Sequence, residues 1–390
     1  MTVAYPIARA WLSTGGTGAQ NYDEFADDAE ITEIIAANPS SALAVEMPHR
    51  APESVGKPFR DCLPDAVARL QAAKDDGHYA AAADVVVLYR ITAPDGARAY
   101  GLWCMIATDQ ISTSADEPGA VIRNEDVFIE KVRERVALAE ATKHLLSPVL
   151  LLQTAHGEAL HAALAQAVAD AGAPAVADTD PAGRTHEIWA VGAGATRDRL
   201  LALAGGGELV VADGNHRSLA AQTAGYPRFL AVVTTPESVA IQPYNRLVSE
   251  LPEALDGLDM EPLGVPADVP ATGGRVHLHT REGAWSVTLP KIADAGVVEN
   301  LDHALVERRL FAETLGLEPG DKRITYVGGD YPAAWLRGEV DAGRAELAVL
   351  IAPVTVDDFV AVNLARQKMP RKSTWFTPKA RAGLVVVELD

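Results

Sequence analysis

The chain has 390 residues, of which 48% are hydrophobic and 22% are charged, a balance typical of globular proteins and not of disordered or fibrous ones. Its length exceeds what one ordinary hydrophobic core organises, so we expect two or three domains. The net charge of -19 repels nucleic-acid phosphates and argues against a general nucleic-acid binder.

The predicted elements of the first 136 residues are three helices, one short strand and one hairpin. In chain order they are an acidic helix over 22–36, a short buried strand over 41–47, an amphipathic helix over 63–74, a β-hairpin formed by 83–90 and 98–106, and a helix within 121–136. We expect Asn124 to cap this last helix, and we expect Lys131, Arg133 and Arg135 to form its solvated face.

Strands and helices alternate through the rest of the chain. The middle third predicts strands over 149–152, 187–191, 208–213 and 229–234, with helices over 156–171 and 196–203 and after residue 214. A stretch richer in Pro and Gly over 251–274 marks an expected domain junction. The last third predicts strands over 275–280, 284–289, 346–351 and 383–389, with helices near 300–315 and 331–343.

Targeting and redox signals are weak in this sequence. The first residues lack a basic region followed by an apolar core, and no apolar run approaches the roughly 18 residues that a membrane span requires. We therefore expect a cytoplasmic protein with no membrane partner. Cys62 and Cys104 belong to no CxxC pair and are expected to be buried free thiols.

The most informative segment is the strand-to-helix turn from Asp213 to Arg217. Gly214 permits a sharp turn, Asp213 can hold a metal or a hydrogen-bond donor, and His216 and Arg217 supply hydrogen-bonding groups beside a helix start that attracts anions. Alternatively, Asp213 is an ordinary helix cap and Arg217 is a solvated or ion-paired side chain.

Two other segments carry groups suited to phosphoryl transfer. Glu125 follows the expected cap, where its charge either complements the helix dipole or deprotonates a hydroxyl nucleophile. Lys372, Ser373 and Thr374 place a cation and two hydroxyls between two prolines, where they either wrap phosphate oxygens or form an exposed loop. For His186 the sequence offers no partner, and a structural role is favoured.

Together these motifs resemble a family of unknown function that is related to the ParB/sulfiredoxin-like free-serine kinases. The turn Ala212-Asp-Gly-Asn-His-Arg217 resembles that family's ADGHHR signature. Further landmarks follow in the family's order: Tyr22-Asp23, Ile122-Arg-Asn-Glu125 with the charged run 131–135, His186-Glu-Ile-Trp189, Pro243-Tyr-Asn-Arg-Leu247, and the ending over 369–384. The landmarks cover nearly the whole chain.

The resemblance implies an α/β (α+β) fold, with a ParB/sulfiredoxin-like mixed-sheet core over 116–250 between α/β extensions over 1–115 and 251–390. It implies a small-molecule kinase that uses Mg2+ and ADP or ATP to phosphorylate the hydroxyl of a free amino acid, most simply serine. Glu125, Asp213 and His216 would be catalytic, with Asp213 also at the metal. The substrate and phosphate groups would be bound by Asn124, Gly214, Asn215, Arg217, Tyr244, Arg246, Lys372, Ser373 and Thr374.

This sequence departs from the family pattern at two positions. Asn124 and Asn215 stand where the related motifs have histidine, and an amide cannot carry a proton near neutral pH. A different acceptor or a lower activity is therefore expected. Two other interpretations stay open: a regulatory protein that binds a nucleotide without catalysis, and a ParB-like, DNA-associated nucleotide switch, which the acidic charge disfavours.

Overall fold

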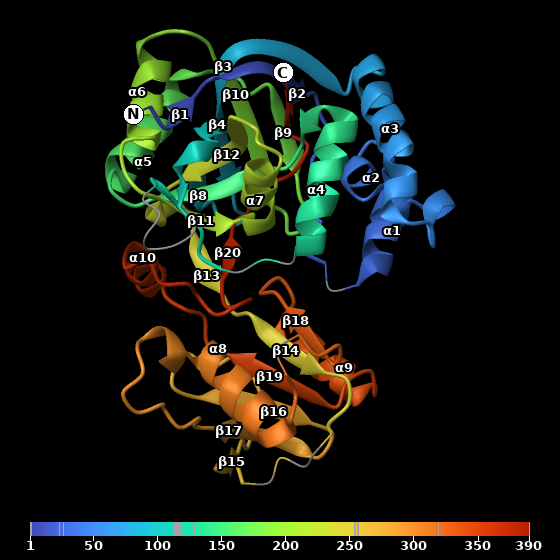
Figure 1. Cartoon of the computed structure of the whole chain (residues 1–390), viewed down its shortest axis with the longest axis vertical. Helices are drawn as coiled ribbons and strands as arrows, with labels where there is room; N and C mark the ends of the chain where they lie inside the picture. Colours follow the sequence, from blue (N-terminus) through green and yellow to red (C-terminus); the bar gives the residue numbers. More distant parts are fainter. Residues whose placement is uncertain are drawn as a thin grey trace. The chain divides into compact units, whose positions relative to one another are not determined.

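The chain forms two compact units (Figure 1). Unit 1 comprises Met1–Val239 and Pro378–Asp390, and unit 2 comprises Ala240–Thr377. The expected junction over 251–274 lies within unit 2, and the divisions expected at 115 and 250 do not coincide with the boundaries of the two units. The computed structural model describes residues 2–22, 24–25, 27–112, 119–125, 127, 129–252, 255, 257–318 and 320–389.

Unit 1 is built on a 13-stranded mixed sheet. Its main path runs β5-β6-β11-β8-β12-β4-β3-β2-β21-β7, with β1 beside β4 and with β10 and β9 branching from β3. The strands are β1 (Ala4–Tyr5), β2 (Ile7–Ser13), β3 (Tyr79–Thr92), β4 (Arg98–Ala107), β5 (Ile111–Ser112), β6 (Val121–Ile122), β7 (His144–Leu145), β8 (Val149–Gln153), β9 (Val176–Thr179), β10 (Thr185–Val191), β11 (Leu209–Asp213), β12 (Arg228–Thr234) and β21 (Val385–Glu388).

The long strand β3 gives this sheet its curl. The first half of β3 pairs with β2, and its second half lies between β4 and β10. Between the two halves, Asp84 has a φ of 50°, a conformation that L-residues seldom adopt. A local bend at this residue lets the two halves of β3 run in different directions and pair with different strands. The predicted hairpin over 83–90 and 98–106 is confirmed as the antiparallel pair of β3 and β4.

Helices cover both sides of this sheet (Figure 1). They are α1 (Asp28–Ala37), α2 (Ala42–Glu46), α3 (Leu63–Asp75), α4 (Ile129–Thr142), α5 (Gly157–Asp170), α6 (Ala195–Ala204) and α7 (Asn215–Thr223). Leu160 and Leu164 of α5 and Leu200 of α6 pack into one apolar core with strands β3, β4 and β8. Leu70 of α3 and Leu138 of α4 belong to a separate core beneath β21.

The strand predicted over 41–47 is wrong, because these residues form α2. The Ser41 hydroxyl accepts a hydrogen bond from the Leu43 amide and caps the helix. Every residue of α2 is buried, so its apolar run carried no helical periodicity to separate it from a buried strand. Cys62 and Cys104 are buried free thiols, as predicted.

Unit 2 contains a six-stranded antiparallel sheet in the order β15-β17-β16-β19-β14-β18, and a separate ribbon of β13 and β20. Its strands are β13 (Ala240–Gln242), β14 (Asn245–Val248), β15 (Met260–Pro262), β16 (Val276–Thr280), β17 (Gly283–Val287), β18 (Ile324–Val327), β19 (Leu347–Ile351) and β20 (Trp375–Thr377). Its helices are α8 (Asp302–Leu305), the π-helix η7 (Val306–Thr314), α9 (Ala333–Asp341) and α10 (Val356–Leu364).

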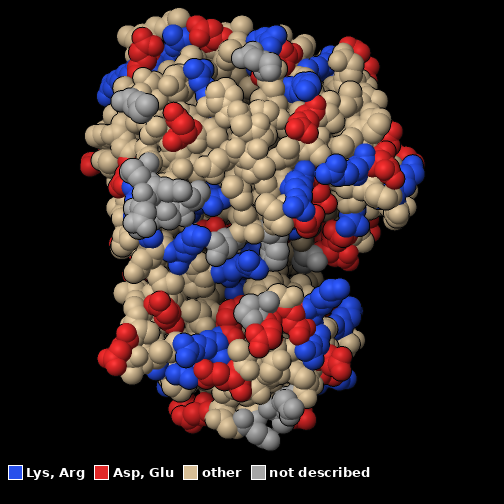
Figure 2. Space-filling model, viewed as in Figure 1, with Lys and Arg blue, Asp and Glu red and all other residues tan. Residues whose placement is uncertain are grey.

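Strand β19 shows how this second sheet is covered on both faces. Leu347, Val349 and Ile351 pack with η7, whereas Ala348 and Leu350 pack with α9. Because successive side chains of a strand point to opposite faces, a strand buried on both faces reads as a continuous apolar run. On the face shown in Figure 2, basic and acidic side chains are interspersed over unit 2. None of the helices in the described part of the chain has the length and hydropathy needed to cross a bilayer.

Candidate functional site

The candidate site of unit 1 lies where the parallel strands β6 and β11 end. Val210 pairs with Ile122, so both strands deliver the chain to the same edge of the sheet. Two residues beyond each strand, Asn124 and Asn215 meet, and Asn215 Nδ2 donates to Asn124 Oδ1 at 2.5 Å. Both asparagines are buried. The two positions at which this chain departs from the related histidine motifs are therefore in direct contact.

The expected role of Asn124 as a helix cap is wrong. Helix α4 begins at Ile129, and the side-chain oxygen of Asn124 accepts from Asn215. Glu125 follows Asn124 directly and is half-buried at the same edge of the sheet. Since the helix starts four residues after Glu125, its first turn does not include this carboxylate. The position of Glu125 therefore disfavours the interpretation that its charge complements the helix dipole.

A bulge and a glycine set the direction of the Asp213 turn. The register between β11 and β8 shifts between Val211 and Asp213, which turns the end of the strand. Gly214 follows with a φ of 94° and precedes the first turn of α7, which has no side-chain cap. The N–H groups of this first turn lie at the positive end of the helix dipole, which favours negative charge. His216 lies in the same turn and is buried.

Replacing Gly214 with Ala is expected to lower the free energy of unfolding by about 1–3 kcal/mol. A Cβ there would lie 3.0 Å from Arg217 Nε and 3.2 Å from Val149 Cα, in a backbone conformation that L-residues avoid. Urea denaturation measures the loss. Gly225→Ala is the matched control, because Gly225 has a φ of 70° but open space around it. Equal losses in the two variants would remove crowding against Arg217 as a cause.

Arg217 is buried and ion-paired. Its Nη2 lies 2.5 Å from Asp213 Oδ2, and its Nη1 donates to Asn21 Oδ1 at 3.1 Å and to the Pro148 carbonyl. Of the two structural alternatives considered for Arg217, solvated or ion-paired, the ion-paired one is observed. The guanidinium ties together the turn, the start of β8 and the N-terminal segment.

Lys379 completes this cluster, and the sequence interpretation did not select it. Its Nζ lies 3.3 Å from Asp213 Oδ1 and 3.8 Å from Glu24 Oε1, and Glu24 also accepts from Asn21 Nδ2 at 2.7 Å. The available signal was its place after Pro378 in the family-like ending of the chain. Asp23, half of the Tyr-Asp pair named above, lies outside the described residues.

Asp213 does not fit the role of a direct metal ligand. Each of its carboxylate oxygens faces a cation, Arg217 on one side and Lys379 on the other. A divalent ion on either oxygen would meet that positive charge at close range. Among the described residues, no group of three or more His, Cys, Asp or Glu side chains is arranged to hold a metal ion.

A buried tyrosine-histidine-aspartate chain anchors the segment that carries Lys379. Tyr89 Oη lies 2.6 Å from His186 Nδ1, and His186 Nε2 lies 3.0 Å from Asp180 Oδ2. The backbone N–H of Arg381 donates to Tyr89 Oη at 3.3 Å. Burial lowers the pKa of His186 and so favours its neutral form. The structure thus gives His186 two partners that the sequence did not reveal.

The remaining predicted residues lie in unit 2. Arg246 is fully buried, and its Nε lies 3.0 Å from Glu307 Oε1 while its Nη1 donates to the Tyr244 carbonyl at 2.9 Å. Lys372 places its Nζ 5.6 Å from the centre of the Tyr244 ring. Ser373 is fully buried and Thr374 is half-buried. Tyr244 is therefore the common neighbour of Arg246 and Lys372.

Unit 2 also buries polar atoms that have no hydrogen-bond partner. They include Arg246 Nη2, Ser373 Oγ and His303 Nε2. Burial, followed by the nearby Arg246 charge, lowers the pKa of His303 to about 3. Buried polar atoms are almost always satisfied in folded proteins, so each such atom is a place where a ligand or water can bind.

Comparison with protein families gives one match. The model of the family described as "Protein of unknown function (DUF1015)" matches residues 16–304. None of the curated proteins compared with the chain matches it.

Several solved structures are similar at low identity. A free serine kinase in complex with AMP has a TM-score of 0.40 and 10% identity, covering 70% of this chain and 87% of that one. SbnI with a C-terminal truncation, from Staphylococcus aureus, has a TM-score of 0.41 and 11% identity, covering 73% and 87%. A conserved hypothetical protein from Pyrococcus furiosus has a TM-score of 0.39 and 11% identity, covering 72% and 95%.

Proposed function

This chain belongs to the DUF1015 family, and we propose that it is a small-molecule kinase that transfers a phosphoryl group from a nucleotide to the hydroxyl of a free amino acid. The motifs that resemble the free-serine kinases favour serine as the acceptor. The donor is a complex of Mg2+ with ADP or ATP, and the metal ion enters as part of that substrate.

One observation carries the proposal. The segment with Glu125 and the turn with Asp213 are separated by 88 residues in the sequence, yet the Asn124–Asn215 hydrogen bond joins their neighbours at one sheet edge. A half-buried carboxylate therefore lies at the edge where α7 presents its uncapped N–H groups. This pairing supplies a base for a hydroxyl and a helix start that favours the negative charge of a phosphate.

The proposed step assigns each group a task. Glu125 accepts the proton of the acceptor hydroxyl, whose oxygen forms a bond to the terminal phosphorus of the nucleotide. The bond between that phosphorus and the bridging oxygen breaks, and its electron pair leaves with AMP or ADP. The N–H groups of the first turn of α7, with His216, stabilise the charge on the transferred group. Arg217 and Lys379 hold Asp213 and the turn in place.

In unit 2 we assign phosphate binding to Lys372, Ser373 and Thr374. Lys372 provides a cation, and the buried Ser373 hydroxyl has no hydrogen-bond partner. Arg246 Nη2 is a second buried donor without a partner. Phosphate oxygens are acceptors that would satisfy such donors.

The proposal is tested by phosphorus NMR of the full chain with Mg2+, ADP or ATP, and one hydroxy amino acid at a time. We expect a new phosphomonoester signal with serine or a close analogue, in step with the release of AMP or ADP. Alanine is the matched control, because it lacks only the hydroxyl. If the nucleotide binds but no acceptor is phosphorylated, the kinase assignment fails and the regulatory interpretation replaces it.

A further inference from the structure

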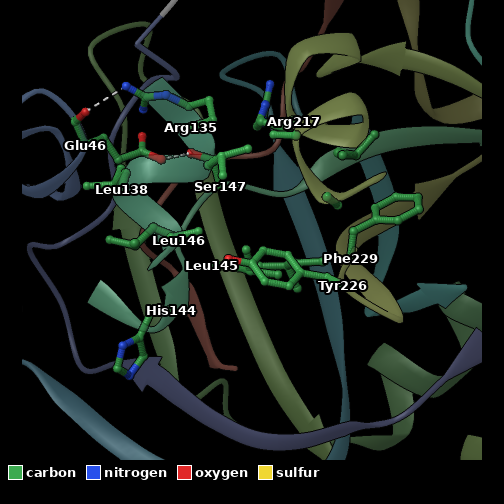
Figure 3. Close-up of a pocket in the computed structure, with 16 residues that line it drawn as sticks. Glu46, Arg135, Leu138, His144, Leu145, Leu146, Ser147, Arg217, Tyr226 and Phe229 are labelled. Atoms are coloured by element: carbon green, nitrogen blue, oxygen red, sulfur yellow. Dashed lines mark hydrogen bonds between the residues drawn. The ribbon is translucent and has the colours of Figure 1, made fainter. Parts of the chain in front are cut away.

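A cavity in unit 1 lies between α4, α7 and the segment that joins β7 to β8. It encloses about 60 Å3 and is lined mainly by apolar side chains, among them Leu138, Leu146 and Phe229 (Figure 3). By the space that one water needs, roughly 10–15 Å3, this volume holds about four to six non-hydrogen atoms. The proposed function does not use this cavity.

Two buried charges of opposite sign line one end of the cavity. Arg135 and Glu46 lie together there, with Ser147 beside them (Figure 3). Arg135 was expected on a solvated helix face, but its relative exposure is 7%, and that of Glu46 is 3%. The Ser147 hydroxyl donates to Glu46 Oε1. The cavity therefore combines apolar walls with a buried carboxylate, that of Glu46, and a buried guanidinium, that of Arg135.

Arg135 keeps unused donors at this site. Its guanidinium carbon lies 4.1 Å from the centre of the Tyr22 ring and 5.3 Å from that of Phe59. Its Nη2 donates to the Glu46 carbonyl at 3.1 Å, whereas its Nε and Nη1 have no hydrogen-bond partner. Leaving buried donors of a charged group unsatisfied costs more than for neutral groups, so a ligand that accepts these bonds is favoured.

We propose that this cavity binds a small aliphatic α-amino acid, with its carboxylate on Arg135 and its ammonium on Glu46. A zwitterion offers a carboxylate to the Arg135 donors that have no hydrogen-bond partner and an ammonium to the Glu46 carboxylate, and it adds no net charge to the buried cavity. The apolar walls and the small volume accommodate an aliphatic side chain of the size of that of alanine, which has six non-hydrogen atoms in all.

This cavity is separate from the proposed phosphoryl-transfer site. The first residue of α4 that lines the cavity is Arg135, which lies six residues, or about 9 Å along the helix, after Ile129. Glu125 lies before Ile129 in the sequence and does not line the cavity. Arg217 lines the cavity and also holds Asp213. The Arg217 side chain therefore connects the cavity to the Asp213 turn.

Calorimetric titration of the full chain without nucleotide tests the proposal. L-Alanine is compared with propanoate, which lacks the ammonium group, and with ethylamine, which lacks the carboxylate. We expect L-alanine to bind at least tenfold more tightly than either half-ligand. Equal binding of propanoate and L-alanine, or no binding of L-alanine at millimolar concentration, would overturn the assignment. Neither outcome depends on kinase activity.

Two variants test the location. Ala220→Leu fills the cavity from α7 and is expected to weaken amino-acid binding at least tenfold, whereas Thr223→Leu, on the exposed face of the same helix, leaves it unchanged. Arg135→Gln removes the charge and is expected to reduce the preference for L-alanine over ethylamine. Circular dichroism verifies that each variant is folded. Unchanged binding in both folded cavity variants would place the ligand elsewhere.

Discussion

Glu125→Gln is expected to lower the rate of phosphoryl transfer by roughly a hundredfold to ten-thousandfold, the usual contribution of a general base. Glutamine keeps the size and the hydrogen-bonding oxygen of the side chain but cannot take up the proton of the acceptor hydroxyl. Because Glu125 is half-buried at the sheet edge and lies outside the apolar cores, we expect the free energy of unfolding to change little.

The measurement is the initial rate of phosphomonoester formation with the acceptor found by phosphorus NMR. Glu130→Gln is the matched control, because Glu130 is an exposed carboxylate in the first turn of α4 that pairs with Arg133. Only the Glu125 variant should lose turnover, while both variants keep their affinity for the nucleotide. Parent-like turnover of Glu125→Gln would remove this residue as the base.

The second large effect concerns acid stability, which we expect His303 to limit in unit 2. Burial and the Arg246 charge lower the pKa of His303 from 6.5 to about 3 in the folded chain. Below pH 6.5 the unfolded chain binds a proton at His303 that the folded chain does not, so acidification favours unfolding. The stabilisation is fully present above pH 6.5, and the loss should reach about 2 kcal/mol at pH 5.

The control for this effect is His303→Asn. Its amide keeps a donor for the hydrogen bond with the Tyr244 carbonyl but has no proton to gain in this range. Hydrogen exchange with mass spectrometry, corrected for intrinsic rates, reports on unit 2 through β16 and β19, with β12 of unit 1 as internal reference. The stability of the parent should fall relative to His303→Asn between pH 7 and pH 5. Parallel pH profiles would contradict the expectation.

Local patterns predicted the elements that carry strong periodicity or turn chemistry. The β3–β4 hairpin, α5 and the strand-turn-helix of β11 and α7 are confirmed, since each is specified by residues close in the sequence. Helix α10 was not predicted, although Thr355 Oγ1 accepts from the Asp358 amide and supplied a capping signal. Helix α2 was misread because short buried runs lack periodicity.

The arrangement of the candidate site depended on distant partners. Asp213 and Arg217 are four residues apart on one turn and form an ion pair, whereas sequence reasoning considered an ion-paired Arg217 without naming its partner. Lys379 meets Asp213 from 166 residues away along the chain, as the difference of 379 and 213 gives. Asn124 meets Asn215 only because β6 and β11 are parallel neighbours. No local pattern encodes such pairings, and the assignment of catalytic and binding roles to these residues stays a proposal.

The path of the chain through the sheet has a consequence for the order of folding during synthesis. Strand β21 pairs with β2 on one side and with β7 on the other, so a strand near residue 390 joins β7, the last strand of the main path, to a sheet that includes β1 and β2. Unit 2 is one continuous stretch, emerges from the ribosome before β21, and has all its strands available earlier. The sheet of unit 1 is completed only after β21 has been synthesised, because β21 lies between β2 and β7. The contact between Lys379 and Asp213 also forms only at that last stage.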